Sequence, residues 1–304
     1  MGIKKLIRNI RFLLKHDLSD WDYYANNLNY FWRKEASAIA ESLKYEWEED
    51  LKELYRPDIK DFEETIDEIL NTDKSFARFG DGEFQIMNNQ RCIFEVPDRK
   101  LSEKLKTVIK AENPDVMVGI PYMYYHSVKN KSELDKPFHR LLGGTFRKTI
   151  ESFIDKNKTY YASDICPYIV SNLDNLDSYY EKIKDIWRNK DITIVCGDKV
   201  FNHIETNIFD CANSIEYLYT PTVNASEKYD EIFERIKEVK NKLIILICGP
   251  VATALAYDVA CYAGTGTKLR ALDLGHIAKD YDYYVNKRSR DNIKSTRKFF
   301  GAED

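Results

Sequence analysis

Residues 243–247 read Leu-Ile-Ile-Leu-Ile, and Cys248-Gly249-Pro250 follows directly. A short run that is apolar at every position is typical of a central strand in a parallel sheet, because such a strand is buried on both faces. The glycine and proline then predict a sharp turn into a helix, since proline fits the first helical turn, where its missing N–H is not needed. This segment therefore predicts a strand, a tight turn and a helix.

Short apolar runs alternate with amphipathic stretches on both sides of this segment. The alternation predicts βαβ units and an α/β fold, in which a Rossmann-like parallel sheet is flanked by helices. The predicted strands are 75–79, 116–120, 159–162, 192–196, 215–219, 243–248 and 269–272. The amphipathic stretches include 101–111, 178–189, 229–239 and 252–262.

The chain divides into three predicted parts. Residues 1–60 are rich in aromatic and charged side chains without a strand pattern, which predicts an N-terminal helical extension. Residues 61–290 form the predicted α/β domain, and residues 291–304 form a polar tail. Residues 3–15 carry apolar side chains and a cationic stripe at helical spacing. Such a helix suits an anionic membrane surface, and equally suits packing on its own domain or on a partner subunit of a homo-oligomer.

Length, charge and cysteine usage limit the class of protein. The 304 residues are enough for a large core, and 46 Lys+Arg against 50 Asp+Glu leave a net charge of −4. This balance argues against nucleic acid as a partner. The six cysteines show no paired spacing, and Cys196, Cys248 and Cys261 lie in or beside apolar runs, as small buried residues do. We expect a reducing, cytoplasmic setting, since neither a signal peptide nor a membrane-spanning run is visible.

Residues 78–83, Arg-Phe-Gly-Asp-Gly-Glu, carry the strongest signal for chemistry. They follow a predicted strand, and Gly82 leaves no side chain between Asp81 and Glu83, so both carboxylates can turn toward one point. Hard oxygen ligands suit Mg²⁺ or Mn²⁺, and such a cation suits a diphosphate. Asp-Gly is also an ordinary turn, and Glu83 also fits the first turn of a helix. Arg78 could contact a phosphate or pair with an acid.

Two further segments follow predicted strands, at the sheet edge where α/β proteins bind ligands. After Gly249 and Pro250 the helix start offers free N–H groups to an anion, and Thr253 adds a hydroxyl. A tight turn without a ligand is the alternative. After the last strand, Asp273 and His276 can act as base, hydrogen-bond a sugar or orient one another. A structural histidine in a loop is the alternative.

Three polar residues lie near the ends of the two neighbouring strands. Asp198 can hold a ribose or sugar hydroxyl, or it can cap a helix. Asn207 lies on the stretch that follows it, and Asn224 lies just after the next strand, where an aromatic side chain could also cover a base.

Taken together, these segments resemble the bacterial GT-D glycosyltransferases, a family formerly described only as a domain of unknown function. The resemblance covers roughly residues 60–285 and depends on six segments in order. They are 78–83, 186–195 (Ile-Trp-Arg before Ile-Thr-Ile-Val), 207–215, 221–225 (Pro-Thr-Val-Asn-Ala), 249–258 (beginning Gly-Pro-Val-Ala-Thr) and 271–276 (Ala-Leu-Asp-Leu-Gly-His).

The resemblance implies a GT-D type Rossmann-like catalytic domain, a UDP-sugar donor and a metal-linked Asp-x-Glu motif, which falls on Asp81 and Glu83. It also implies a glycan or glycoprotein acceptor in surface polysaccharide synthesis or adhesin glycosylation. The chain departs from the family pattern after Cys196, where family members carry an acidic residue and a Ser-Arg pair, and Lys199 is the candidate substitute for that arginine. It also has Val251 where the family has threonine.

We therefore expect a cytoplasmic, metal-dependent hexosyltransferase, placed either free or at the inner face of the membrane. Glu83 is expected to take part in catalysis through the metal, and Asp273 or His276 to deprotonate the acceptor hydroxyl or position the sugar. The donor is expected to contact Arg78, Gly80, Asp198, Asn207, Asn224, Gly249, Pro250 and Thr253. A non-catalytic nucleotide-sugar-binding subunit of a polysaccharide assembly complex is the alternative. A Rossmann-type oxidoreductase fits less well, because the Gly-x-Gly-x-x-Gly fingerprint is missing.

Overall fold

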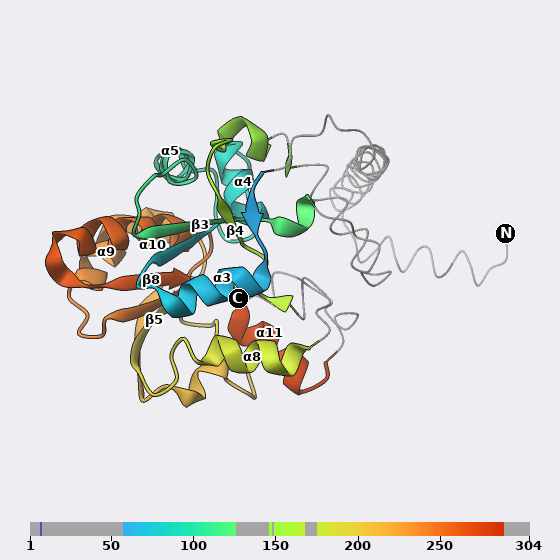
Figure 1. Cartoon of the computed structure of the whole chain (residues 1–304), viewed down its shortest axis with the longest axis vertical. Helices are drawn as coiled ribbons and strands as arrows, with labels where there is room; N and C mark the ends of the chain where they lie inside the picture. The colour runs from blue at the N-terminus through green and yellow to red at the C-terminus, as the bar shows by residue number, and fades with distance from the viewer. Residues whose placement is uncertain (1–6, 8–56, 126–145, 148, 168–174, 289–304) are drawn as a thin grey trace.

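The computed structural model describes residues 7, 57–125, 146–147, 149–167 and 175–288. Its centre is an 8-stranded sheet in the order β1-β4-β3-β2-β8-β7-β5-β6, in which every neighbouring pair is parallel. Helices cover both faces (Figure 1). The strands are β1 (Ile59–Lys60), β2 (Ser75–Arg78), β3 (Val116–Ile120), β4 (Tyr160–Ala162), β5 (Asp191–Gly197), β6 (Ser214–Thr220), β7 (Leu243–Ile247) and β8 (Arg270–Asp273).

The helices between the strands vary in length, and short 3₁₀ segments supplement them. The α-helices are α3 (Phe62–Asn71), α4 (Asp81–Met87), α5 (Arg99–Val108), α8 (Leu176–Lys184), α9 (Tyr229–Lys237), α10 (Pro250–Tyr262) and α11 (Ile277–Val285). The 3₁₀ segments are η2 (Tyr122–Tyr124), η3 (Ile208–Cys211) and η4 (Ala225–Lys228), and a π-helical turn, η5 (Ala263–Thr267), follows α10.

The predicted α/β class and parallel sheet are confirmed, and each predicted strand is present within one or two residues of its expected bounds. All five residues of β7 are buried, as its uniform apolar run indicates. The sequence did not predict β1. This strand has two residues and pairs with β4 at the edge of the sheet, so it is too short to show alternation. It lies just before residue 61, the predicted start of the α/β domain.

The direction of each chain crossover decides which face of the sheet its helix covers. Connections that step toward β1 place α4, α5, α9 and α10 in one buried cluster. Connections that step toward β6 place α3, α8 and η3 in the cluster on the opposite face. This is what a uniform crossover hand requires. Because β8 lies between β2 and β7 but leads into α11 on the other face, the chain diverges to both faces at the ends of these three strands.

The helix after β7 is almost wholly buried. α10 packs over β2 and β8, and its buried residues run from Pro250 through Ala256 and include Val259 and Ala260. Cys261, expected from its apolar surroundings to be buried, is exposed because it lies on the opposite side of α10 from the sheet, whereas Cys196 and Cys248 are buried.

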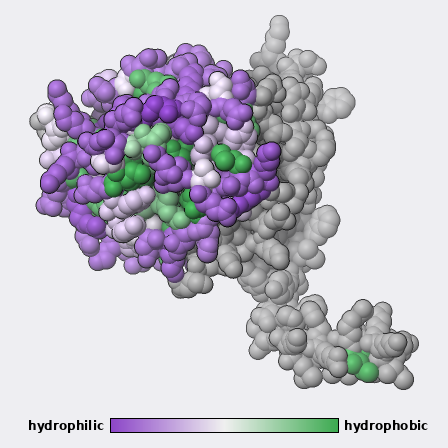
Figure 2. All heavy atoms as spheres, turned by 90° about the horizontal axis from the view of Figure 1, so that it is seen from below, coloured by the Kyte–Doolittle hydropathy of each residue, from purple (hydrophilic) through white to green (hydrophobic). Residues whose placement is uncertain are grey.

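The expectations for residues 3–15 and for the tail 291–304 lie outside the described residues, apart from Ile7, which is exposed. Among the described helices, none combines the length and apolar character needed to cross a membrane. The face in Figure 2 is mostly hydrophilic, with small separate groups of hydrophobic residues.

Candidate functional site

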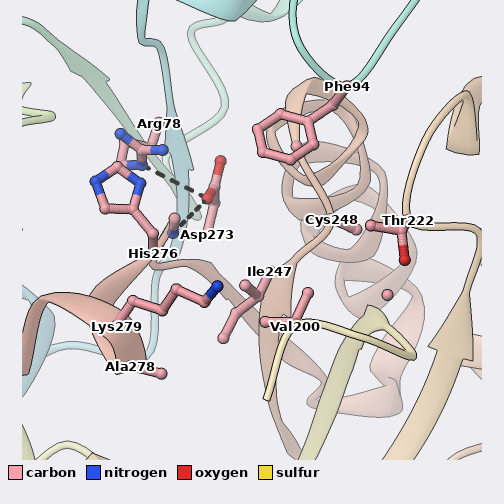
Figure 3. Close-up of a pocket in the computed structure, with 13 residues that line it drawn as sticks. Arg78, Phe94, Val200, Thr222, Ile247, Cys248, Asp273, His276, Ala278 and Lys279 are labelled. Carbon is pink, nitrogen blue, oxygen red and sulfur yellow. Dashed lines mark hydrogen bonds and ion pairs between the residues drawn. The ribbon is translucent and has the colours of Figure 1, made fainter. Parts of the chain in front are cut away.

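A pocket of about 80 Å³ lies at the carboxyl ends of β2, β5, β7 and β8. Figure 3 shows Arg78, Asp273 and His276 on one side of it and Phe94, Cys248 and Thr222 on the other. This is the edge where the chain diverges to both faces of the sheet, the usual place for a ligand in such folds. The pocket is lined by Arg78, Phe94, Gly197, Val200, Thr222, Ile247, Cys248, Gly249, Asp273, Gly275, His276, Ala278 and Lys279.

Arg78 ends β2, and its guanidinium connects the two acidic parts of the site. Its Nε lies 3.6 Å from Oδ1 of Asp273, whose side chain is only 2% exposed. Burial lowers the pKa of Arg78, but the charges of Asp273 and Glu83 outweigh burial and raise it. Arg78 is therefore a fixed cation between two carboxyl groups.

Asp273 is held from several sides. The backbone N–H of Gly275 donates to its Oδ1 (3.0 Å), and the Thr253 hydroxyl lies 3.0 Å from its Oδ2 and 2.7 Å from the backbone oxygen of Arg78. Burial raises the pKa of Asp273, while Arg78 and these hydrogen bonds oppose that rise. Thr253 thus joins α10 to the ends of β2 and β8, but it does not line the pocket.

Gly275 permits the close approach of Arg78. Its φ is +55°, and a Cβ at this position would lie 2.5 Å from Nη2 of Arg78. Any side chain here would therefore displace the guanidinium and strain the backbone.

The Asp81–Glu83 motif begins α4, directly after β2. Glu83 is 5% exposed, and its Oε2 accepts a 2.6 Å hydrogen bond from the N–H of Gly80, closing a capping box. Burial raises the pKa of Glu83 to about 7, although Arg78 opposes the shift. Asp81 is exposed. Glu83 therefore has the structural role that the sequence left open, at a place that Arg78 connects to the pocket.

The turn from β7 into α10 has the geometry that its sequence predicts. Gly249 adopts φ +62°, and Pro250 occupies the first turn of α10. A Cβ on Gly249 would lie 3.1 Å from Cβ of Phe94, and a Cβ on Gly82 would lie 3.4 Å from Cγ of Pro250. The starts of α4 and α10 are therefore adjacent, and the segment containing Phe94 crosses the turn.

Three predicted contacts are not among the residues that line the pocket. Asp198 is exposed and accepts a hydrogen bond from the Thr222 hydroxyl at 3.1 Å. Asn207 caps η3 by accepting from the N–H of Phe209. Asn224, at φ +54°, accepts from the N–H of Val96, so it anchors the segment that carries Phe94.

Sequence reasoning missed Phe94, Thr222 and Lys279. Phe94 lies in a segment without helical or strand periodicity, and Lys279 lies on α11, past the strand end that was considered. Burial lowers the pKa of Lys279 to about 8, with Asp282 opposing the shift. Proximity to Gly-His after the last strand was the available signal for Lys279.

Within the described residues, no three or more His, Cys, Asp or Glu side chains are grouped as a metal site. The carboxylates of Asp81 and Glu83 are chemically suitable for Mg²⁺ or Mn²⁺, but as a pair they fit such an ion only where a substrate supplies further oxygens.

Comparison with known proteins gives consistent relatives. Residues 76–301 match the family described as "Glycosyltransferase GT-D fold". "Glycosyltransferase GlyD" of Streptococcus pneumoniae is 27% identical over 235 residues, which cover 74% of this chain and 27% of that protein. "Probable glycosyl transferase Gly" of Streptococcus gordonii is 27% identical over 226 residues, which cover 73% of this chain and 32% of that protein. The chain thus matches about a third or less of the length of these curated relatives.

Solved structures agree. "A New Glycosyltransferase (DUF1792) from Streptococcus sanguinis" has a TM-score of 0.70 and 27% identity, covering 77% of this chain and 87% of that chain. A second structure, titled as showing that the domain of unknown function 1792 "has a distinct glycosyltransferase fold", has a TM-score of 0.69 and 26% identity, covering 76% and 82%.

Proposed function

The chain belongs to the family of GT-D fold glycosyltransferases, and on that premise we propose that it transfers a sugar from a nucleoside-diphosphate sugar, UDP-linked, to a glycan or glycoprotein hydroxyl. The observation that carries the proposal is the pocket at the ends of β2, β5, β7 and β8, bordered by Arg78 and by the start of α10.

The start of α10 is the proposed contact for a phosphate. The helix has 13 residues, and its first N–H groups lack intrahelical acceptors and carry the positive end of the helix dipole. Gly249 has no side chain between this helix start and the pocket, which allows an anion to approach the backbone. A diphosphate supplies the matching negative charge.

Phe94 is the proposed contact for the base. Its side chain is half-buried and lines the pocket on the side away from Arg78 (Figure 3). Aromatic rings stack on nucleobases of any sequence, and such stacking contributes on the order of 1–3 kcal/mol. A base beside Phe94 would leave the diphosphate facing α10 and the sugar toward His276.

Asp81 and Glu83 are the proposed holders of Mg²⁺ or Mn²⁺, with diphosphate oxygens completing the set. Magnesium sites commonly use one or two carboxylates together with substrate phosphates. A bound cation supplies positive charge that stabilises the departing diphosphate. Arg78 keeps Glu83 in the same charged group as Asp273.

His276 is the proposed base, in preference to Asp273. In the reaction the acceptor oxygen bonds to the anomeric carbon, the bond from that carbon to the diphosphate oxygen breaks, and the diphosphate leaves with its electron pair. The acceptor proton must go to a base. Asp273 already accepts from Gly275 and Thr253 and faces Arg78, so it serves to position that arginine. The neutral imidazole of His276 on the pocket wall can take the proton.

The test uses purified chain with UDP-, GDP- and dTDP-sugars, with and without Mn²⁺, and measures release of the nucleoside diphosphate. We expect a UDP-sugar to be turned over and Glu83→Gln to lower turnover by about 100-fold or more. Glutamine keeps an acceptor for the Gly80 N–H, so α4 stays capped. Glu64→Gln is the matched control, because Glu64 closes the same kind of capping box at α3 and should leave turnover unchanged.

Equal turnover by Glu83→Gln and wild type would refute the role of Glu83. UDP binding by wild type without any turnover or hydrolysis would instead support the alternative of a non-catalytic nucleotide-sugar-binding subunit.

A further inference from the structure

Lys279 lies in the first turn of α11, three residues after His276. Its side chain extends into the pocket, with the amino end directed toward the interior (Figure 3). The pocket therefore receives a cation from α11, on the face of the sheet opposite to the one that α10 covers.

The position is locally unfavourable for a lysine. Cations are disfavoured in the first turn of a helix, where the dipole is positive. The side chain is also half-buried, and the lowered pKa shows that its charge is partly desolvated. Conflicts of this kind between local preference and observed structure concentrate at functional sites.

The charge of the pocket wall depends on this residue. Among the described residues that line the pocket, the charged ones are Arg78, Asp273 and Lys279. Arg78 faces Asp273 and feels the charge of Glu83, so those groups balance one another. Lys279 makes the net charge of the lining positive, which favours an anionic ligand group.

We propose that Lys279 binds the diphosphate of the donor, from the side of the pocket opposite the start of α10. This inference rests on the proposed function and adds to it a protein cation that binds the leaving group directly. An ammonium group beside a diphosphate forms charge-assisted hydrogen bonds, which are about twice as strong as neutral ones. Lys279 would accordingly distinguish a nucleoside diphosphate from a nucleoside.

The test measures binding of UDP, UMP and uridine by calorimetry, with Mn²⁺ and again with EDTA, and screens GDP and dTDP in the same way. We expect Lys279→Met to weaken UDP binding by about 10- to 100-fold, to weaken UMP binding less and to leave uridine unchanged. Lys279→Arg should retain most of the UDP affinity. Neither substitution should lower the melting temperature, because methionine removes a half-buried charge and arginine keeps the cation.

Lys74→Gln is the matched control. Lys74 precedes β2, at the amino edge of the sheet, and pairs with Glu68 at 2.6 Å, so its loss should leave UDP binding unchanged. Unchanged UDP affinity in Lys279→Met, or equal losses for UDP and uridine, would overturn the inference while leaving the proposed function in place. Failure of wild type to bind UDP, GDP or dTDP would overturn both.

Discussion

Arg78 shows, at the scale of single residues, how much of the site the sequence could predict. Its place at a strand end and the place of Asp273 at another were both predictable from the apolar runs. Their pairing was not, because it depends on β8 inserting beside β2, which a linear pattern does not specify. The need for glycine at 275 was equally invisible, since it arises from the approach of a guanidinium from a distant strand.

Gly275→Ala tests this arrangement at the residue scale. The new Cβ would lie 2.5 Å from Nη2 of Arg78, at a φ of +55° that alanine disfavours. We expect unfolding free energy, measured by urea denaturation, to fall on the order of 1–3 kcal/mol, and UDP-sugar turnover to fall with it.

Gly264→Ala provides the control for that experiment. A Cβ on Gly264 meets nothing within 4 Å, so both stability and turnover should remain near wild type. Equal stability and turnover in Gly275→Ala and Gly264→Ala would contradict the packing of Arg78 against Gly275.

At the scale of elements, the segment 92–96 is the part of the site that sequence reasoning could not find. It has no periodicity, and its position comes from contacts with the connection after β6. Asn224 accepts from the N–H of Val96, and Ser226 donates to Glu95 through its N–H (3.1 Å) and its hydroxyl (2.8 Å). Strands and most helices were predictable because burial imposes a period, whereas this segment is fixed by individual hydrogen bonds.

Glu95 makes the stability of this segment depend on pH. The side chain is 2% exposed, and burial raises its pKa to about 7, with the Ser226 hydrogen bonds opposing the rise. Between the ordinary pKa of glutamate, about 4.3, and this raised value, the folded state binds more protons than the unfolded state. The contribution of Glu95 to stability therefore falls as pH rises through this window.

Glu95→Gln should remove that dependence. Near pH 4 the variant and wild type should have similar unfolding free energies, since protonated glutamate resembles glutamine. By pH 8 the variant should have gained relative to wild type by up to about 3 kcal/mol, from the linkage of 1.36 kcal/mol per pKa unit. Urea denaturation across this range measures the difference, in which contributions of other groups cancel. A constant difference between the two proteins would contradict the raised pKa of Glu95.

At the scale of the whole molecule, the crossover directions explain where the pocket forms. Steps in one direction place helices on one face and steps in the other direction on the opposite face, so the ends of β2, β8 and β7 send the chain to alternate faces. The parallel sheet and the edge that carries the ligand were predictable from alternating patterns. The strand order was not, because β7 and β8 insert between earlier strands.

The most direct test of the account is a crystal structure of the chain with UDP and Mn²⁺. We predict electron density for the nucleotide in the pocket, with its diphosphate between the start of α10 and the side chains of Arg78 and Lys279. A nucleotide bound elsewhere, away from the carboxyl ends of β2, β7 and β8, would contradict the assignment of this pocket as the donor site.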